Sequence, residues 1–176
     1  PGIPEMAAIE PNTFLRIEDV NGDDADEVVL CSGGNTIYCL NGNASGTADI
    51  IWEKIIGTVE YTRGISSIND INGDGFKDII IGTAWSDKAI TALSGLTGNI
   101  IWRHQTNNYG SGGWVYAVDG HFDYNGDAFP DVLAATGDDA NGTGPKRVYC
   151  LNGQTGEVIW EFPNYGAVYS VIGIND

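Results

Sequence analysis

The sequence has few basic side chains and no long apolar run. Eight Lys and Arg residues stand against 24 Asp and Glu residues in 176, which gives a formal net charge of −16 at pH 7. So few basic residues form no stripe that could meet phosphates, and we therefore expect no nucleic-acid partner. No apolar run approaches the roughly 20 residues that a membrane-spanning helix requires, so we expect no membrane insertion.

Residues of the common catalytic and zinc motifs are also scarce. The two His residues, His104 and His121, form no recognisable catalytic arrangement with other residues, and neither a Gly-x-Ser-x-Gly motif nor a P-loop is present. The three Cys residues show no zinc-binding spacing. We interpret Cys39 and Cys150, which occupy the same place in a repeat, as small buried core residues. The sequence does not decide whether Cys31 and Cys39 form a disulfide bridge.

What the chain does contain is one acidic nine-residue motif in three copies. "DVNGDDADE" begins at Asp19, "DINGDGFKD" at Asp70 and "DYNGDAFPD" at Asp123, and "IND" at Asp176 would open a fourth copy. The intervals between these starts are 51, 53 and 53 residues. The motifs hold 11 of the 24 acidic residues. Such a regular spacing places the motif in a repeated structural unit, and such focused charge favours bound cations.

Short apolar segments bounded by turn residues flank each acidic motif, one before the motif and three after it. In the middle copy they cover 64–70, 78–84, 89–95 and 99–106, and they are rich in β-branched residues without a helical period. Four short antiparallel strands in about 50 residues are typical of a β-propeller blade. The sequence therefore predicts an all-β fold, with residues 1–176 forming a partial β-propeller. We place its blades at about 13–57, 64–106 and 114–163, and the first strand of a further blade at 167–176.

The predicted fourth strands share one aromatic position. Trp52, Trp102 and Trp160 recur there. We interpret them as packing between neighbouring blades, with a sugar-stacking platform as the alternative reading. Propellers usually have four to eight blades. Three blades and one strand therefore indicate a segment of a longer chain, or copies that associate to complete a ring or to form a fibre.

The acidic motif has the composition of a calcium loop. Calcium takes six to eight oxygen ligands, and the side chains at positions 1, 3 and 5 of a tightly turned loop converge on one centre. Gly at position 4 permits the turn. Position 7 would contribute its backbone carbonyl, and the carboxylate at position 9 would close the cage at the start of the next strand. The competing interpretation is that Asp, Asn and Gly serve only as turn formers.

Two stretches carry a family resemblance. "DINGDGFKDIIIG" and "DYNGDAFPDVLAA" resemble the FG-GAP or VCBS repeats of integrin-α-type β-propellers, which hold calcium in such loops. The resemblance implies about three calcium ions per chain. The first loop departs from the pattern, with Asp24 in place of Gly, an added Asp26 and Glu27 in place of Asp. The implied ligands are Asp19, Asn21, Asp23, Ala25 and Glu27; Asp70, Asn72, Asp74, Phe76 and Asp78; and Asp123, Asn125, Asp127, Phe129 and Asp131.

A second resemblance concerns the ends of the blades. "YCLNGQTGEVIW" and "TALSGLTGNIIW" are similar to the blade-closing motif of quinoprotein (PQQ) propellers, and "YCLNGNASGTADIIW" carries an insertion in it. In that family the Trp and Gly of the motif belong to blade packing, and the cofactor is bound elsewhere. The motif therefore supports the fold more than it supports redox chemistry.

Together these features predict a non-catalytic, calcium-binding module at the cell surface or in the extracellular space, which serves adhesion or binds a protein or carbohydrate ligand. Millimolar extracellular calcium fills sites of modest affinity. Sequons at Asn43 and Asn141 are compatible with this setting, and the loops 105–113 and 138–145 are the expected contact surfaces. The alternatives are a segment of a propeller enzyme, either a polysaccharide lyase or a quinoprotein dehydrogenase, and a subunit of an extracellular fibre.

Overall fold

The computed structural model describes residues 14–31, 34–59, 64–85, 87–108, 112–137, 144 and 146–174. These residues form twelve strands, and no helix occurs among them. No helix in this part of the chain is therefore long and apolar enough to cross a membrane. The strands are β1 (Phe14–Ile17), β2 (Glu27–Cys31), β3 (Thr36–Leu40), β4 (Ile50–Ile55), β5 (Ile65–Ile68), β6 (Asp78–Gly82), β7 (Ala89–Leu93), β8 (Ile100–Gln105), β9 (Trp114–Phe122), β10 (Asp131–Gly137), β11 (Arg147–Leu151) and β12 (Val158–Pro163).

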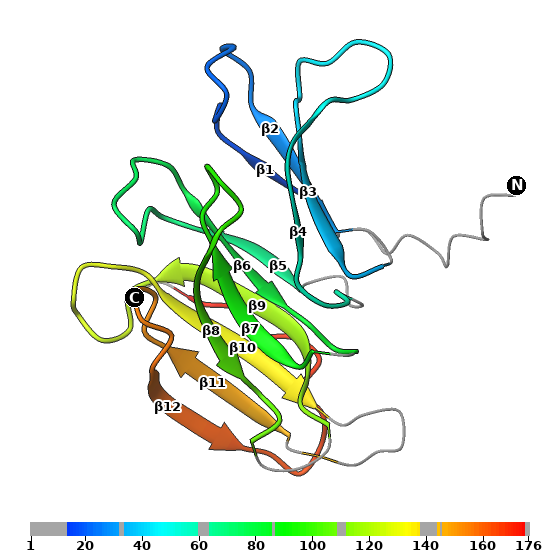
Figure 1. The fold of residues 1–176 in the computed structure, drawn as a ribbon. Helices are drawn as coiled ribbons and strands as arrows, with labels where there is room; N and C mark the ends of the chain where they lie inside the picture. Colours follow the sequence, from blue (N-terminus) through cyan, green and yellow to red (C-terminus); the bar gives the residue numbers. More distant parts are fainter. Residues whose placement is uncertain are drawn as a thin grey trace, which may run out of the picture.

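The strands form three antiparallel groups of four, in chain order (Figure 1). We call β1–β4 the first blade, β5–β8 the second and β9–β12 the third. A parallel bridge between Ile68 and Gly120 joins β5 to β9, so the second and third blades share one eight-stranded sheet. The first strands of these two blades, β5 and β9, thus lie side by side, as they do around the axis of a propeller (Figure 1). The prediction of an all-β fold built from four-stranded blades is confirmed.

Burial along the strands reflects the position of each blade. In β2 and β3, buried residues alternate with more exposed ones, because the first blade is covered on one face only. In β6 and β7 every residue is buried, since the second blade lies between the other two, and β10 of the third blade is buried throughout as well. One apolar cluster joins the first blade to the second through residues such as Val29 and Ile37 on one side and Ile79 and Ile81 on the other.

Two tryptophans connect neighbouring blades. The indole N–H of Trp52 donates to the carbonyl of Gly95 at 3.0 Å, and that of Trp102 donates to the carbonyl of Gly153 at 2.6 Å. Both indoles are buried. The equivalent Trp160 has no following blade among the described residues, and 43% of it is exposed. The interpretation as packing between blades therefore fits Trp52 and Trp102.

All three cysteines are free and buried. In the register of β2 and β3, Cys39 lies opposite Val29 and Cys31 lies opposite Ile37. The two cysteines are therefore not opposite each other, and no disulfide bridge forms between them. Burial raises the pKa of each thiol to about 12, and the negative charge of Glu27 contributes at Cys39. These residues behave as small apolar core residues.

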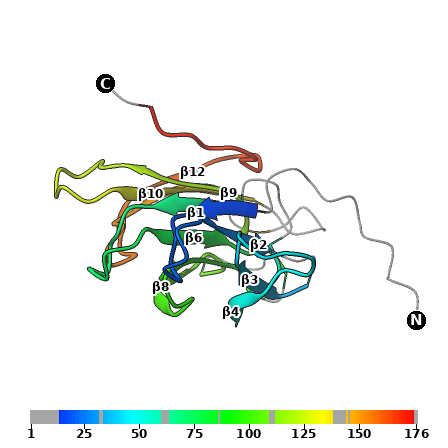
Figure 2. The ribbon, with the colours of Figure 1, turned by 90° about the horizontal axis from the view of Figure 1, so that it is seen from above.

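Residues 167–174, the described part of the expected first strand of a further blade, form no strand. The segment lies along the third blade (Figure 2), with hydrogen bonds from Val168 N–H to the Thr136 carbonyl at 3.2 Å and from Gly173 N–H to Asp119 Oδ2 at 2.7 Å. In every blade the first strand pairs with the second strand of the same blade. No such partner follows this segment in the described residues. Asp176 lies outside them.

Candidate functional site

Each acidic loop connects the first strand of its blade to the second, and its first carboxylate organises the turn. Asp70 Oδ1 accepts the N–H of Gly73 at 2.6 Å, and Oδ2 accepts the N–H of Gly75 at 2.8 Å. Asp19 and Asp123 accept the N–H groups of the equivalent residues at 2.6–2.9 Å. The three loops therefore share one backbone fold.

These bonds also set the acidity of the first carboxylate. Desolvation acts to raise the pKa of Asp19 and of Asp70, but four backbone N–H groups around each outweigh it, and both pKa values lie below the ordinary range. A carboxylate held in this way stays ionised at neutral pH.

The predicted role of the fourth-position glycine is confirmed by its backbone angles. Gly22, Gly73 and Gly126 have φ values of 84°, 81° and 81°, which favour glycine. The sixth position is also left-handed, with a Gly in the second loop but Asp24 and Ala128 in the other two, at φ values of 67° and 74°. The first and third loops therefore accept a backbone conformation that costs roughly 1–2 kcal/mol for a residue with a Cβ.

The carboxylate at position 9 is fully buried in every loop. Asp78 opens β6, and its oxygens accept the N–H of Ile71 at 2.9 Å and of Gly95 at 3.2 Å, so it ties the loop to the turn after the third strand. Burial raises the pKa of Asp78 to about 6 against these hydrogen bonds, and the charges of Asp74 and Asp70 add to the rise. Burial also raises the pKa of Asp131.

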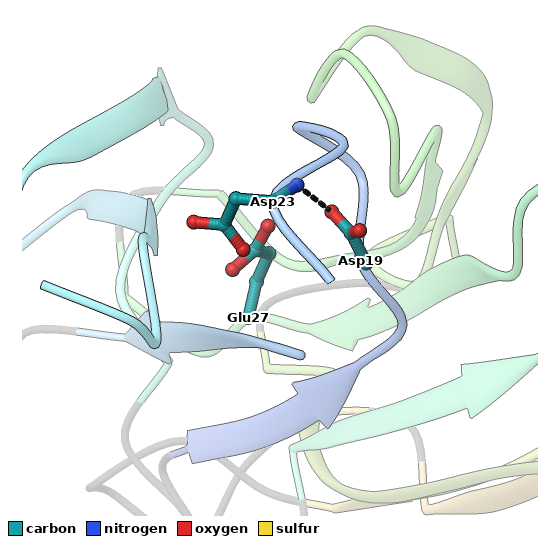
Figure 3. Close-up of side chains that lie close together, drawn as sticks. All are labelled: Asp19, Asp23 and Glu27. Carbon is teal, nitrogen blue, oxygen red and sulfur yellow. Dashed lines mark hydrogen bonds between the residues drawn. The ribbon is translucent and has the colours of Figure 1, made fainter. Parts of the chain in front are cut away.

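In the first loop three carboxylates converge (Figure 3). One oxygen each from Asp19, Asp23 and Glu27 lies within 4.8 Å of the others. Twice the calcium–oxygen distance of 2.3–2.6 Å is about 5 Å, so one calcium ion fits among these oxygens. Glu27 is one methylene longer than the Asp of the other loops. Its carboxylate is the ninth-position member of this group.

In the second and third loops an asparagine amide lies between two carboxylates. Asn72 Nδ2 donates to Asp74 Oδ2 at 2.9 Å and to Asp78 Oδ1 at 3.2 Å. Asn125 Nδ2 makes the same two bonds to Asp127 and Asp131, at 2.9 and 3.3 Å. Among the described residues no group of three carboxylates is as close here as in the first loop. The positively polarised NH2 group of each amide thus contacts the carboxylates that a calcium ion would contact.

The remaining residues of the predicted ligand sets form hydrogen bonds within their own loops. Asn21 Nδ2 donates to Asp23 Oδ2 at 3.4 Å, which is longer than the bonds of its two counterparts. At position 7 the N–H groups of Ala25, Phe76 and Phe129 donate to the fifth carboxylate at 2.9–3.0 Å. A ligand role for the carbonyls of these three residues stays a prediction. The carboxylate oxygens of the set suit calcium, whereas the three Asn amides turn Nδ2 toward the carboxylates.

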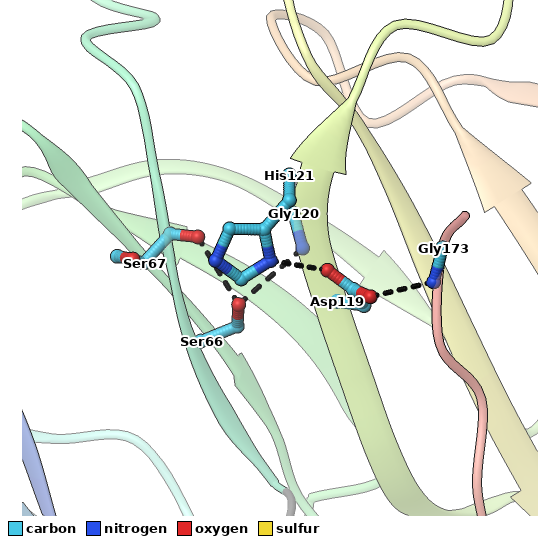
Figure 4. A network of polar contacts seen from close by, with 6 residues as sticks. All are labelled: Ser66, Ser67, Asp119, Gly120, His121 and Gly173. Atoms are coloured by element: carbon cyan, nitrogen blue, oxygen red, sulfur yellow. Dashed lines mark hydrogen bonds and ion pairs between the residues drawn. The ribbon is translucent and has the colours of Figure 1, made fainter. Parts of the chain in front are cut away.

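Sequence reasoning missed a second site. A cavity of about 310 Å³ lies against the first strands of all three blades and the C-terminal segment. On its wall His121 Nδ1 contacts Asp119 Oδ1, and Gly120 N–H donates to Ser66 Oγ at 3.3 Å (Figure 4). Asp119 is buried, while 58% of the His121 side chain is exposed. The Asp-x-His spacing at the end of β9 is the sequence signal that could have indicated this pair.

Comparison with known proteins supports the repeat. Residues 19–81 match the FG-GAP-like repeat family, which confirms the predicted resemblance for a segment that spans the first two acidic loops. The crystal structure of BamB from Moraxella catarrhalis is similar at 19% sequence identity and a TM-score of 0.39, over 81% of this chain and 50% of that one. The chain thus spans half the length of that protein. No curated protein sequence matches the chain.

Proposed function

We propose that this chain is a non-catalytic, calcium-stabilised β-propeller module of the extracellular space or cell surface that serves adhesion or binds a protein or carbohydrate. One observation carries the calcium part of the proposal. Three loops, each at the same place in its blade, share one backbone turn around an ionised carboxylate, and in the first of them three carboxylate oxygens lie within 4.8 Å of one another.

Calcium would act on the blades as a structural ion. The first, third and fifth side chains of each loop would hold it, together with the ninth carboxylate that opens the second strand. Asp78 already connects the loop to Gly95, in the turn after β7, so a calcium ion in this loop would stiffen a contact between three strands of one blade. Three bound ions would change the formal charge from −16 to about −10. Such sites fill where calcium is millimolar, which supports an extracellular location.

The cavity against the first strands is the surface that we assign to ligand binding. Its walls combine apolar residues such as Phe14 and Val118 with the Asp119–His121 pair, which is a composition suited to a small polar ligand or an inserted side chain. The expected contact loops 105–113 and 138–145 lie partly outside the described residues. The sequon at Asn141 lies wholly outside them. Asn43 is exposed.

The Asp119–His121 pair also favours a second candidate function. A buried carboxylate that orients an imidazole beside a cavity is an arrangement used for general-base catalysis, which a lyase requires. A lyase would form an unsaturated product with ultraviolet absorbance from an acidic polysaccharide, and His121→Ala would abolish this activity. A binding module shows no turnover.

Thermal unfolding with and without calcium tests the proposed function. We expect calcium to raise the melting temperature of the chelated protein much more than magnesium does. Asp19→Asn, Asp70→Asn and Asp123→Asn should each remove part of that rise, and Asp49→Asn should remove none, because Asp49 is an exposed acid outside the loops. Equal melting temperatures with and without calcium would contradict the proposal.

A further inference from the structure

A hydrogen bond joins the first acidic loop to the second across the interface between their blades. Glu18, the residue directly before Asp19, accepts the backbone N–H of Lys77 on Oε1 at 2.6 Å. Because the acceptor is a carboxylate, this is one of the stronger types of hydrogen bond. Lys77 is the eighth residue of the second loop and directly precedes Asp78. The bond therefore links the neighbour of the first predicted ligand of one loop to the neighbour of the ninth predicted ligand of the next.

A second connection from the first blade reaches the same part of the second loop. The Trp52 indole donates to the Gly95 carbonyl at 3.0 Å, and the Gly95 N–H donates to Asp78 Oδ1 at 3.2 Å. A Cβ added to Gly95 would lie 2.0 Å from the carbonyl oxygen of Lys77, so this glycine packs directly on the residue whose N–H Glu18 accepts. The end of the second loop is thus held from the first blade at two points.

The interface between the second and third blades keeps only one of these connections. Trp102 and Gly153 repeat the indole bond there, at 2.6 Å. The residue before the second loop, however, is Asn69, and the eighth residue of the third loop is Pro130. Proline has no backbone N–H, so Pro130 cannot donate the bond that joins the first two loops. The chain therefore contains an internal control, an equivalent pair of loops without this bond.

We infer that Glu18 couples the first two acidic loops, so that filling either of them with calcium raises the calcium affinity of the other, while the third loop stays outside this coupling. The inference rests on the proposed calcium binding and adds a positioning residue to it. An Asp19 held in a filled loop fixes Glu18 beside it, and Glu18 fixes the Lys77 N–H next to Asp78. Asp78 then loses less conformational freedom when its own loop fills. The coupling acts equally in both directions, as a coupling free energy between two binding sites must.

Repulsion between bound cations acts with the opposite sign. It weakens with distance and with salt, and it acts between the second and third loops as well as between the first and second. Only the first pair has the Glu18 bond in addition. Comparison of the two pairs therefore separates the effect of the bond from that of the charges.

Calcium titration of the full chain, followed by nuclear magnetic resonance, tests the inference loop by loop. In every loop the N–H of the fourth-position glycine donates to the first carboxylate, so its amide signal reports the filling of that loop; these glycines are Gly22, Gly73 and Gly126. We expect Asp19→Asn to weaken calcium binding at the second loop about 5-fold, and Asp70→Asn to weaken it at the first loop by the same factor. Asp123→Asn should cause no such loss at either loop. Melting curves establish that each variant is folded.

Variants at Glu18 connect the coupling to the bond itself. In a Glu18→Ala background, Asp19→Asn should no longer affect the second loop, and the Lys77 amide of the calcium-free protein should exchange its hydrogen faster. Glu18→Gln keeps an uncharged acceptor and should retain part of the coupling. Glu53→Ala is the control, because Glu53 is an exposed acid of β4 outside the loops, and it should change neither result.

The possible outcomes separate this inference from the proposed function. If calcium fills all three loops but the second loop has the same affinity in the wild type and in Asp19→Asn, the inference is overturned and the proposed function stands. An unchanged exchange rate of the Lys77 amide in Glu18→Ala would also overturn it. If no glycine signal moves at millimolar calcium, the proposed function is contradicted, and the inference with it.

Discussion

Acidification should stabilise the calcium-free protein between about pH 7.5 and about pH 5, because Asp78 is a buried carboxylate among other acidic groups. Its pKa rises from 3.8 to about 6 on folding, chiefly through burial. A carboxyl group with a raised pKa favours the folded state when it is protonated, so stability increases as the pH falls through about 6. The pKa of Asp131 is raised as well, and its effect has the same sign.

The size of the effect follows from the two pKa values. With values of 3.8 and about 6, the charged carboxylate costs the folded state about 3 kcal/mol at pH 7.5 and about 1.6 kcal/mol at pH 5. We expect about 1 kcal/mol of this difference in the measured free energy of unfolding. For a domain of this size, that free energy corresponds to a rise of about 2–4 °C in melting temperature.

The carboxylates with lowered pKa values do not change the stability between pH 7.5 and pH 5. The pKa values of Asp19, Asp70 and Asp127 lie below the ordinary value, and at Asp127 the N–H of Phe129 is the largest cause. A group of this kind loses its stabilising effect only as the pH falls toward its lowered pKa, below 3.8. Stability should therefore pass through a maximum on acidification and fall again below about pH 4.

The assay is thermal or urea unfolding of the chelated protein across this range. Asp78→Asn should lack part of the stabilisation, while Asp49→Asn, which removes the same charge from an exposed site, should keep all of it and correct for the overall negative charge. With calcium bound the sign should reverse, because protons compete with the ion for the carboxylates. Equal pH dependence in the wild type and Asp78→Asn would refute the reasoning.

Three further results are expected. Gly98→Ala should lower the free energy of unfolding by about 2–4 kcal/mol, because its Cβ meets the Trp52 ring, while Gly46→Ala should cost only about 1 kcal/mol, since Gly46 has a similar positive φ but no atom within 4 Å; equal losses in urea unfolding would contradict the clash. Trp102→Phe should cost about 1–3 kcal/mol by leaving the Gly153 carbonyl without its indole donor, and an unchanged urea midpoint would count against this contact. The three buried thiols should resist alkylation at pH 8 in the folded protein and all react in denaturant, and rapid labelling of the folded chain would contradict their burial.

The strands and the acidic loops could be predicted because each depends on local sequence. Runs such as "DIIIG" combine β-branched residues with bounding turn residues. The repeat interval aligns three copies, so the strands of a copy with a weaker pattern can be assigned from the other two. The left-handed glycine at position 4 follows from the same local chemistry.

The features that could not be predicted from the sequence depend on contacts between blades or on the detailed geometry of side chains. The cavity beside His121 requires the first strands of three blades, and the exposure of Trp160 depends on which blade follows it. The convergence of Glu27 with Asp19 and Asp23 depends on side-chain geometry that a pattern of residue types does not reveal. Residues 167–174 have the composition of a strand, but a strand forms only beside a partner.

The most direct test of the account is the number of calcium ions that the chain binds. Equilibrium dialysis of the chelated protein against millimolar calcium, followed by elemental analysis, should give about three ions per chain, and one fewer for each of the three variants in which the first Asp of a loop is replaced by Asn. A chain that retains no calcium at millimolar concentration would contradict the account, and the three acidic loops would then be turns alone.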